Sequence, residues 1–353
     1  MKKIEEFLEI AINQKASDLH LIAGSPPILR INGVLTSIAG EKVLGEEEVK
    51  DLVFALLNDE QKEILLVNKE IDFSIAYRDR GRFRVNAYYQ KGTLAASLRL
   101  LPLIIPNIDE LNLPEICHEF AKLKQGFILV TGPTGHGKST TLAAIIEEIN
   151  QTRPVHIITI EDPVEYVFSS QQGIISQREL RADTHSWQIA LRSCLREDPD
   201  VVMIGEMRDY ETISSALTIA ETGHLVFATL HTNSAAQSVD RIVDVFPEYQ
   251  QAQVKMQLSN TLEAILSQRL LPALEGGRIP ALEILLATPA VRTTIREGKT
   301  YLIDSIIQTS IELGMRSLEM DLARLVKKGK ITLEAAKAYT LRPEELMRLM
   351  KKG

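Results

Sequence analysis

The segment Gly132–Thr140 constrains the fold of this 353-residue chain more than any other. It reads Gly-Pro-Thr-Gly-His-Gly-Lys-Ser-Thr and matches the GxxxxGK[ST] pattern of a phosphate-binding loop. An apolar run, Phe127–Val130, precedes the loop, and apolar residues at helical spacing follow it from Leu142 to Ile149. This order of strand, glycine-rich loop and helix predicts that backbone N–H groups and a helix N-terminus converge on one phosphate.

The types of residue in the loop indicate a nucleotide with Mg²⁺. We expect the nucleotide to be held by Gly132, Pro133, Thr134, Gly135, His136, Gly137, Lys138, Ser139 and Thr140. Lys138 should reach the β- and γ-phosphates of ATP, and the Ser139 hydroxyl should ligate Mg²⁺. The His136 side chain is expected to point to solvent, because the backbone of such a loop does the binding.

A second strand end supplies the acid that such a site requires. The apolar run Val201–Ile204 leads through Gly205 to Glu206, in the arrangement of a Walker B strand. We expect Glu206, with Ser139, to hold Mg²⁺, in the case of Glu206 through a water bound to the ion. The Glu206 carboxylate could instead polarise the attacking water. The alternative interpretation is a solvated acid near the start of the next helix.

Two other strand ends carry candidate catalytic side chains. Glu161 and Glu165 follow the apolar run Ile157–Ile160, and one of them is a candidate general base or a side chain that holds a Mg²⁺ ligand in place. His231 follows the run Leu225–Thr229, where a neutral imidazole could sense the γ-phosphate. Ligands bind at the carboxyl ends of strands in open α/β sheets, although solvated acids and a structural histidine would produce the same pattern.

The chain divides into four predicted parts. Residues 1–100 alternate helical and strand periodicity and predict a small α+β domain, and the proline-containing segment 101–114 predicts a linker. Short apolar strands alternating with helices over 115–289 predict a parallel sheet covered on both faces, which makes the fold class α/β. The region 290–353 is predicted to be helical.

Composition excludes several classes of protein. A net charge of −7 argues against a broad nucleic-acid-binding surface, which requires a basic stripe. The two cysteines, Cys117 and Cys194, form no CxxC pair, so a zinc site of the usual spacing is excluded. Because no apolar stretch is long enough to span a bilayer, we expect a soluble, cytoplasmic protein without direct membrane insertion.

Several ordered motifs together resemble the PilT family, the retraction ATPases of type IV pili within the secretion ATPase superfamily. The resemblance covers almost the whole chain. Ile160–Tyr166 resembles the family's Asp box, Asp198–Asp209 its Walker B motif, and Ala220–His224 with Thr229–Thr232 its His box. Further matches are the N-terminal residues Ala16–His20, Gly24, Pro26, Pro27, Arg30 and Gly33, and the later segment Arg241–Pro247.

The resemblance implies an ATP-hydrolysing hexameric motor that powers pilus retraction and twitching motility. It implies a PAS-like N-terminal domain, a RecA-like ATPase domain that binds ATP and Mg²⁺, and a homohexameric ring. Arginines would reach the nucleotide from a neighbouring subunit or domain, and the basic strand face with Arg82, Arg84 and Arg99 is the candidate source. The implied partner is the inner-membrane platform protein of the pilus machine, which would hold the motor at the inner membrane.

The segment Ala290–Glu297 resembles the family's retraction signature, with Arg292, Arg296 and Glu297 retained and Thr294 in place of an apolar residue. Thr288-Pro289 before it and Gly298 after it predict a helix of about two turns. Arg292 and Arg296 are four residues apart on one helical face, which indicates an acidic partner or a neighbouring acidic segment. The family also usually has Ser at the position of His136.

Three other functions remain as alternatives. An assembly ATPase for pilus extension or type II secretion usually carries a further N-terminal domain and a tetracysteine motif, neither of which we expect here. A DNA-handling ATPase of the same superfamily conflicts with the net charge. A non-hydrolysing, nucleotide-binding regulatory ring conflicts with the presence of Lys138, Ser139, Glu206 and His231.

Overall fold

The computed structural model describes residues 3–31, 33–78, 80–101 and 104–351. The chain forms two compact units, Met1–Ile104 with Pro163–Val167 and Ile105–Asp162 with Phe168–Gly353. The boundary at Ile104 falls inside the segment 101–114, of which residues 102–103 lie outside the described residues. The segment 163–167 groups with the first unit, although we assigned it to the 115–289 core.

The first unit contains an antiparallel sheet with the strand order β3-β2-β1-β6-β5-β4. Its strands are β1 (Asp18–Ile22), β2 (Ile28–Ile31), β3 (Val34–Ser37), β4 (Glu70–Tyr77), β5 (Gly81–Gln90) and β6 (Thr93–Leu101). Its helices are α1 (Ile4–Asn13), α2 (Glu46–Phe54) and α3 (Asp59–Asn68). Buried side chains of these helices and of one sheet face, including Phe7 and Phe83, form its core.

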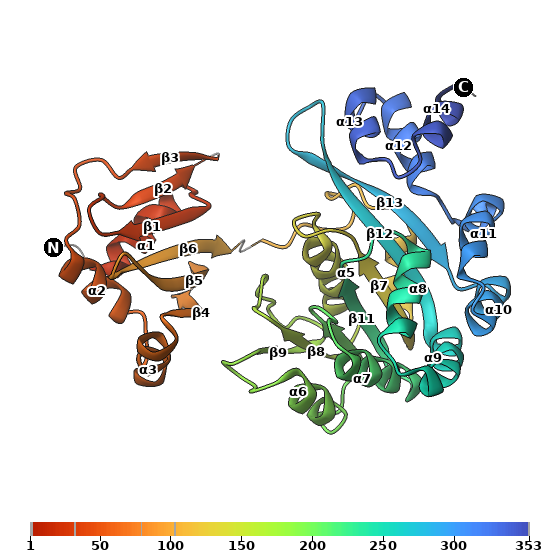
Figure 1. Cartoon of the computed structure of the whole chain (residues 1–353), viewed down its shortest axis with the longest axis horizontal. Helices are drawn as coiled ribbons and strands as arrows, with labels where there is room; N and C mark the ends of the chain where they lie inside the picture. The colour runs from red at the N-terminus through yellow and green to blue at the C-terminus, as the bar shows by residue number, and fades with distance from the viewer. Residues whose placement is uncertain (1–2, 32, 79, 102–103, 352–353) are drawn as a thin grey trace. The chain divides into compact units, whose positions relative to one another are not determined.

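The second unit contains a sheet with the order β13-β12-β7-β11-β10-β8-β9, in which only the β12–β13 pair is antiparallel among the described residues (Figure 1). Its strands are β7 (Gly126–Thr131), β8 (His156–Glu161), β9 (Ile174–Glu179), β10 (Val201–Ile204), β11 (Leu225–Leu230), β12 (Leu262–Pro272) and β13 (Arg278–Leu286). The predicted strands β7, β8, β10 and β11 are present, and sequence reasoning missed β9, β12 and β13.

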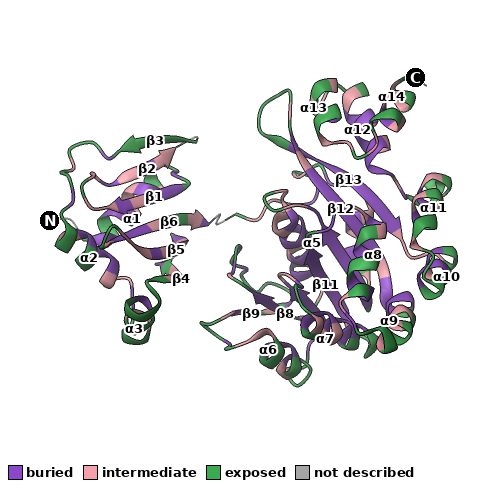
Figure 2. Cartoon of the chain, viewed as in Figure 1, coloured by how far each residue is buried: buried purple, intermediate pink, exposed green. Residues whose placement is uncertain are grey.

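Helices cover this sheet, and its central strands are buried along their whole length (Figure 2). The helices that precede β12 are α4 (Ile116–Lys122), α5 (Lys138–Thr152), α6 (Trp187–Cys194), α7 (Tyr210–Glu221), α8 (Ala235–Asp244) and α9 (Glu248–Thr261). Those that follow β13 are α10 (Pro289–Glu297), η1 (Thr300–Leu302), α11 (Ile303–Thr309), η2 (Ile311–Leu313), α12 (Leu318–Lys327), α13 (Leu333–Tyr339) and α14 (Pro343–Lys351). The structure therefore has an α/β fold with a helical C-terminal end.

Helix α10 begins and ends where the sequence predicts. The Thr288 side chain accepts a hydrogen bond from the N–H of Val291, Pro289 occupies the first turn, and Gly298 ends the helix in the left-handed conformation at φ 69°. Its apolar side packs against α9.

Among the described residues, no helix has both the length and the apolar character needed to cross a membrane.

Candidate functional site

The glycine-rich loop joins the carboxyl end of β7 to the first turn of α5. Gly132, Gly135 and Gly137 have φ angles of +141°, +80° and +80°, a region that side chains disfavour. A Cβ atom at Gly132 would lie 2.4 Å from the carbonyl oxygen of Gln268, so the loop fits only with glycine at this position. The local backbone therefore has the curled form that a phosphate-binding loop needs.

Lys138 is the first residue of α5, and its side chain is buried against the loop. Its ammonium Nζ donates hydrogen bonds to the carbonyl oxygens of Gly132 at 2.9 Å and Pro133 at 3.1 Å. The α5 N-terminus adds a partial positive charge at the same place, since the first N–H groups of a helix lack partners within it. Together they place positive charge at the loop, where the sequence predicts a phosphate.

Glu206 lies one residue beyond Gly205, which follows the last residue of β10. One carboxylate oxygen, Oε2, accepts from the Arg208 guanidinium at 2.8 Å, and the other, Oε1, lies 2.9 Å from Nε2 of His231. Burial raises the pKa of Glu206, but the hydrogen bond from Arg208 and the interaction with His231 outweigh it, so the pKa lies below its ordinary value. Glu206 is therefore ionised at neutral pH.

His231 connects Glu206 to the glycine-rich loop. Its second ring nitrogen, Nδ1, lies 3.3 Å from the hydroxyl of Thr134. A neutral imidazole satisfies both contacts, with Nε2–H donating to Glu206 and Nδ1 accepting from Thr134. The structure thus brings the predicted residues after β7, β10 and β11 together at one edge of the sheet.

Glu161 ends β8 beside this group. A Cβ atom at Gly205 would lie 3.3 Å from the Cα of Glu161, so the ends of β8 and β10 are in close contact. The Glu161 side chain is buried and accepts hydrogen bonds from Thr159 at 2.7 Å and Gln177 at 3.2 Å. The other candidate base, Glu165, is exposed and belongs to the first compact unit.

The expectation that His136 points to solvent is wrong. Its Nδ1 accepts the backbone N–H of Leu270 at 2.9 Å, and its ring centroid lies 6.0 Å from that of Tyr339. Burial lowers the pKa of His136, and the charges of Arg269 and Lys138 lower it further. The reason is tertiary, because β12, which sequence reasoning missed, runs alongside the loop and supplies the hydrogen-bond donor.

Sequence reasoning also missed the β12 residues that support the loop. The Gln268 side chain donates to the carbonyl oxygen of His136 at 2.7 Å and accepts from the Thr141 hydroxyl at 2.7 Å. The Arg269 guanidinium contacts Asn233, two residues after His231. The apolar residues on either side of Gln268 and Arg269 could have indicated a buried strand, but no local signal indicates the contacts of that strand with the loop.

The three candidate arginines belong to the first unit. Arg82 and Arg84 lie on one face of β5, and Arg84 pairs with Arg99 of β6 in the strand register. Nε of Arg99 donates to the buried carboxylate of Asp18 at 2.9 Å, and Arg82 donates to the Ser74 hydroxyl. The predicted polar face of the two strands is therefore present.

In α10 the two arginines have different surroundings. The Arg292 guanidinium donates to the carbonyl oxygens of Ser259 and Asn260, both at 2.9 Å, and to the Glu263 carboxylate at 2.8 Å. The acidic partner expected for this helix is therefore a neighbouring segment of the chain itself. Three other residues of the motif, Ala290, Arg296 and Glu297, are exposed.

The donors around the loop suit Mg²⁺, which prefers oxygen ligands and keeps several waters. The Ser139 hydroxyl and the Glu206 carboxylate are such donors, and no group of three or more His, Cys, Asp or Glu side chains suited to a metal occurs among the described residues.

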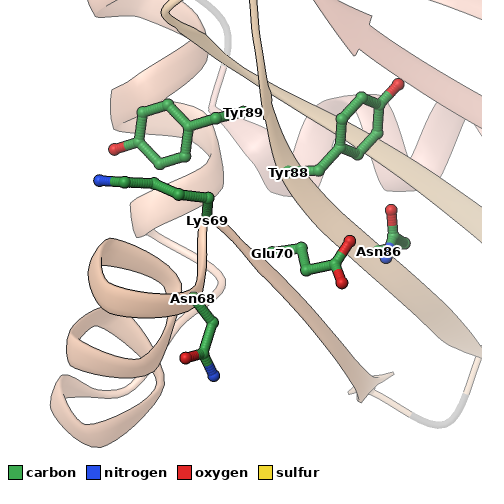
Figure 3. A pocket seen from close by; sticks show the side chains of 6 residues that line it. All are labelled: Asn68, Lys69, Glu70, Asn86, Tyr88 and Tyr89. Atoms are coloured by element: carbon green, nitrogen blue, oxygen red, sulfur yellow. The ribbon is translucent and has the colours of Figure 1, made fainter.

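A separate cavity of about 390 Å³ lies in the first unit, lined by Asn68, Lys69, Glu70, Asn86, Tyr88 and Tyr89 (Figure 3). None of the predicted site residues lines it.

The carboxyl ends of these parallel strands thus bring the glycine-rich loop and a carboxylate–imidazole pair to one edge of the sheet, the arrangement expected of a P-loop nucleotide-binding protein. The chain belongs to the family of type II/IV secretion system proteins, whose model matches residues 1–278. This result and the relatives described next confirm the resemblance that the motifs indicate.

Individual relatives match the chain over nearly its whole length. It is 46% identical to the type IV pilus retraction ATPase PilT of Pseudomonas aeruginosa, over 97% of this chain and 99% of that protein. It is 48% identical to a twitching motility protein of Neisseria gonorrhoeae, over 92% of this chain and 87% of that protein. A crystal structure of the pilus retraction motor PilT with bound ADP superposes with a TM-score of 0.93 at 47% identity, covering 99% of this chain and 100% of that one.

Proposed function

We propose that this protein is an ATP-hydrolysing motor that powers type IV pilus retraction and twitching motility. The observation that carries the proposal is the convergence of Lys138, Glu206 and His231 with the loop at one sheet edge. Relatives named as retraction and twitching proteins match nearly the whole chain, and one of them binds ADP. Hydrolysis of ATP to ADP and phosphate is the reaction that these side chains suit.

Each side chain has a role that follows from its charge and position. Lys138 binds the β- and γ-phosphates in place of the loop carbonyls that it now contacts. Ionised Glu206 orients the attacking water and accepts a hydrogen bond from it. His231, between Glu206 and Thr134, is placed to respond to the γ-phosphate. Glu161, buried and bonded to protein groups, supports the strand end, and exposed Glu165 stays a second candidate base.

Ser139 and Glu206 would hold Mg²⁺ with the phosphates, and the ion would neutralise charge that develops on the transferred phosphoryl group. Because both Glu206 oxygens already accept hydrogen bonds, the carboxylate is better suited to bind the ion through water than directly. The remaining loop residues contribute backbone N–H groups, as proposed for Gly132–Thr140 as a whole.

We further propose a homohexameric ring in which Arg82, Arg84 or Arg99 of one subunit reaches the nucleotide of another. In this proposal the first unit is a PAS-like domain over 1–100, joined by the linker 101–114 to a RecA-like core over 115–289 and a helical region over 290–353. The motor would act in the cytoplasm, at the inner membrane, through the platform protein of the pilus machine.

A phosphate-release assay with ATP and Mg²⁺ tests the enzymatic part. Lys138→Ala should abolish turnover, whereas Glu206→Gln should keep ADP binding and lower turnover by roughly 10²–10⁴-fold, the usual contribution of a general base. Exposed Lys328→Ala and Glu312→Gln are matched controls that should leave turnover unchanged. Wild-type turnover in Glu206→Gln would remove the role assigned to this carboxylate.

Deletion of the gene tests the direction of the motor. Loss of retraction should stop twitching and leave many surface pili, whereas loss of an extension or secretion ATPase leaves few or none. Cells without twitching and without pili would therefore favour the assembly ATPase, and a wild-type protein that binds nucleotide without releasing phosphate would favour the regulatory ring.

A further inference from the structure

Two residues of β12, Gln268 and Leu270, hold the glycine-rich loop from its side. The Gln268 side chain donates to the carbonyl oxygen of His136 in the loop and accepts from Thr141 in α5, and its backbone carbonyl fits against Gly132, where a Cβ would lie 2.4 Å away. The backbone N–H of Leu270 donates to His136 at 2.9 Å. These contacts assign this stretch of β12 to the support of the loop, and Arg269 lies between the two residues.

The Arg269 side chain reaches the loop that carries His231. One terminal nitrogen donates to Oδ1 of Asn233 at 2.9 Å and to its carbonyl oxygen at 3.3 Å, and the other donates to the carbonyl oxygen of Gln268 at 3.3 Å. In the strand order β12-β7-β11, β7 separates Arg269 from the strand that leads to Asn233. The guanidinium therefore crosses the carboxyl end of β7, where the glycine-rich loop begins.

The charge of Arg269 is unusual for its surroundings. The residue is 5% exposed, and among the residues that the structure describes no carboxylate forms an ion pair with it. Burial lowers its pKa, and the more distant carboxylates Glu283 and Glu319 only partly oppose this effect. Buried charges are normally paired, so a guanidinium held here by an amide and two carbonyls leaves positive charge available to an anion.

A side chain with a purely structural role at this position would not need a positive charge. A neutral side chain could bridge Asn233 and Gln268 without the cost of burying a cation. The positive charge also acts on the loop itself, since Arg269 and Lys138 both act on the His136 imidazole. Arg269 thus links the loop after β11 to β12 and places a positive charge beside the glycine-rich loop.

We propose that Arg269 is a positioning residue for recognition of the γ-phosphate, holding the His231 loop through Asn233 at a fixed place relative to the glycine-rich loop. The inference rests on the proposed ATPase function and adds a residue to it. ATP should depend on this tie more than ADP does, because only ATP carries the phosphate that His231 is placed to sense.

Three variants separate the tie from the charge. Arg269→Gln removes the charge, Arg269→Lys keeps it but cannot bridge Asn233 and Gln268 in the same geometry, and Asn233→Ala keeps Arg269 and removes its side-chain acceptor. We measure the dissociation constants of ADP and of a non-hydrolysable ATP analogue, kcat and KM for ATP, and thermal unfolding. The exposed Lys328→Gln is the control for loss of a positive charge in the same unit.

The expected result is a selective defect. Arg269→Gln and Asn233→Ala should each lower kcat at least tenfold and weaken the ATP analogue at least fivefold, with ADP affinity changed less than about twofold. Arg269→Lys and Asn233→Ala both break the contact between the side chains at 269 and 233. The double variant should therefore show a defect little larger than that of Arg269→Lys alone. Lys328→Gln should match the wild type in every measurement.

Two outcomes would overturn the inference while the proposed function stands. One is wild-type kcat and wild-type nucleotide preference in a folded Asn233→Ala protein. The other is an equal loss of affinity for ADP and the ATP analogue together with a lower unfolding temperature, which would show a structural role only. A wild-type protein that binds neither nucleotide would instead overturn the proposed function, and this inference with it.

Discussion

A buried glutamate in β13 should make the stability of the second unit fall as pH rises. Glu283 is 2% exposed, and its Oε1 accepts the backbone N–H of Ala235, at the start of α8, at 2.7 Å. Burial raises the pKa of this carboxyl from an ordinary 4.5 to about 7, although the Ala235 hydrogen bond and the charge of Arg342 oppose the change. The folded protein therefore keeps a proton that the unfolded chain loses at lower pH.

The sign and size of the effect follow from this difference. A carboxyl with a raised folded-state pKa contributes stability below pH 4.5, and that stability is lost as the pH rises to about 7. At 1.36 kcal/mol per pKa unit, the loss is about 3 kcal/mol when complete, and most of it falls between about pH 5 and pH 8. Glu283→Gln keeps the acceptor for Ala235 without a charge, so the variant should be more stable than the wild type by about 3 kcal/mol at pH 8.

Urea unfolding followed by Trp187 fluorescence measures this directly. Trp187 is the single tryptophan of the chain and packs against the core of the second unit, so its signal reports that unit. Glu283→Gln should show a flatter dependence of unfolding free energy on pH than the wild type. Exposed Glu312→Gln serves as the control and should keep the wild-type slope. Equal slopes for Glu283→Gln and the wild type would refute the reasoning.

Three further expectations concern the motor. Gly132→Ala should lose nucleotide binding in a fluorescence titration, because its Cβ would lie 2.4 Å from the Gln268 carbonyl; unchanged binding would mean that the loop adapts. Arg292→Ala with Arg296→Ala should leave substantial ATP hydrolysis but stop twitching and leave cells hyperpiliated, and normal twitching would make α10 only structural. An Arg82, Arg84 and Arg99 triple alanine variant should lose ATPase activity and regain part of it in rings mixed with Lys138→Ala, whereas full activity alone would remove the arginine hypothesis.

The central strands and the loop were predictable because their signals are local. β7, β8, β10 and β11 are short apolar runs that parallel, doubly covered strands require, and the loop pattern contains its own strand and helix. The capping residues Thr288 and Gly298 likewise place both ends of α10 within a few residues of sequence. In each case the determining interactions lie within one element and its immediate neighbours.

The strands that were missed depend on contacts between distant residues. β9 carries polar residues, and β12 contains Glu263 near its start and Ser267, Gln268 and Arg269 between apolar residues, so neither follows a simple pattern. Ser267, Gln268 and Arg269 are buried because a partner from far along the chain satisfies each of them, such as Thr131 for Ser267 at 2.9 Å. The orientation of His136 depends on the same strand, and so no local reading could have predicted it.

Strand β12 also lies against both α10 and the glycine-rich loop, the two regions that the motifs single out. Arg292 of α10 binds Glu263 near the amino end of β12, and Arg269 lies six residues further along, about 20 Å at the usual rise of a strand. The buried Ser267–Thr131 hydrogen bond holds β12 in register with β7 between these points. Loss of the Arg292 contacts should therefore loosen α10 without displacing Gln268 and Arg269, so hydrolysis and retraction should separate in Arg292 variants. If Arg292→Ala lowered turnover as much as Arg269→Gln, β12 would have to shift as one rigid element, and the two regions would share a single conformational equilibrium.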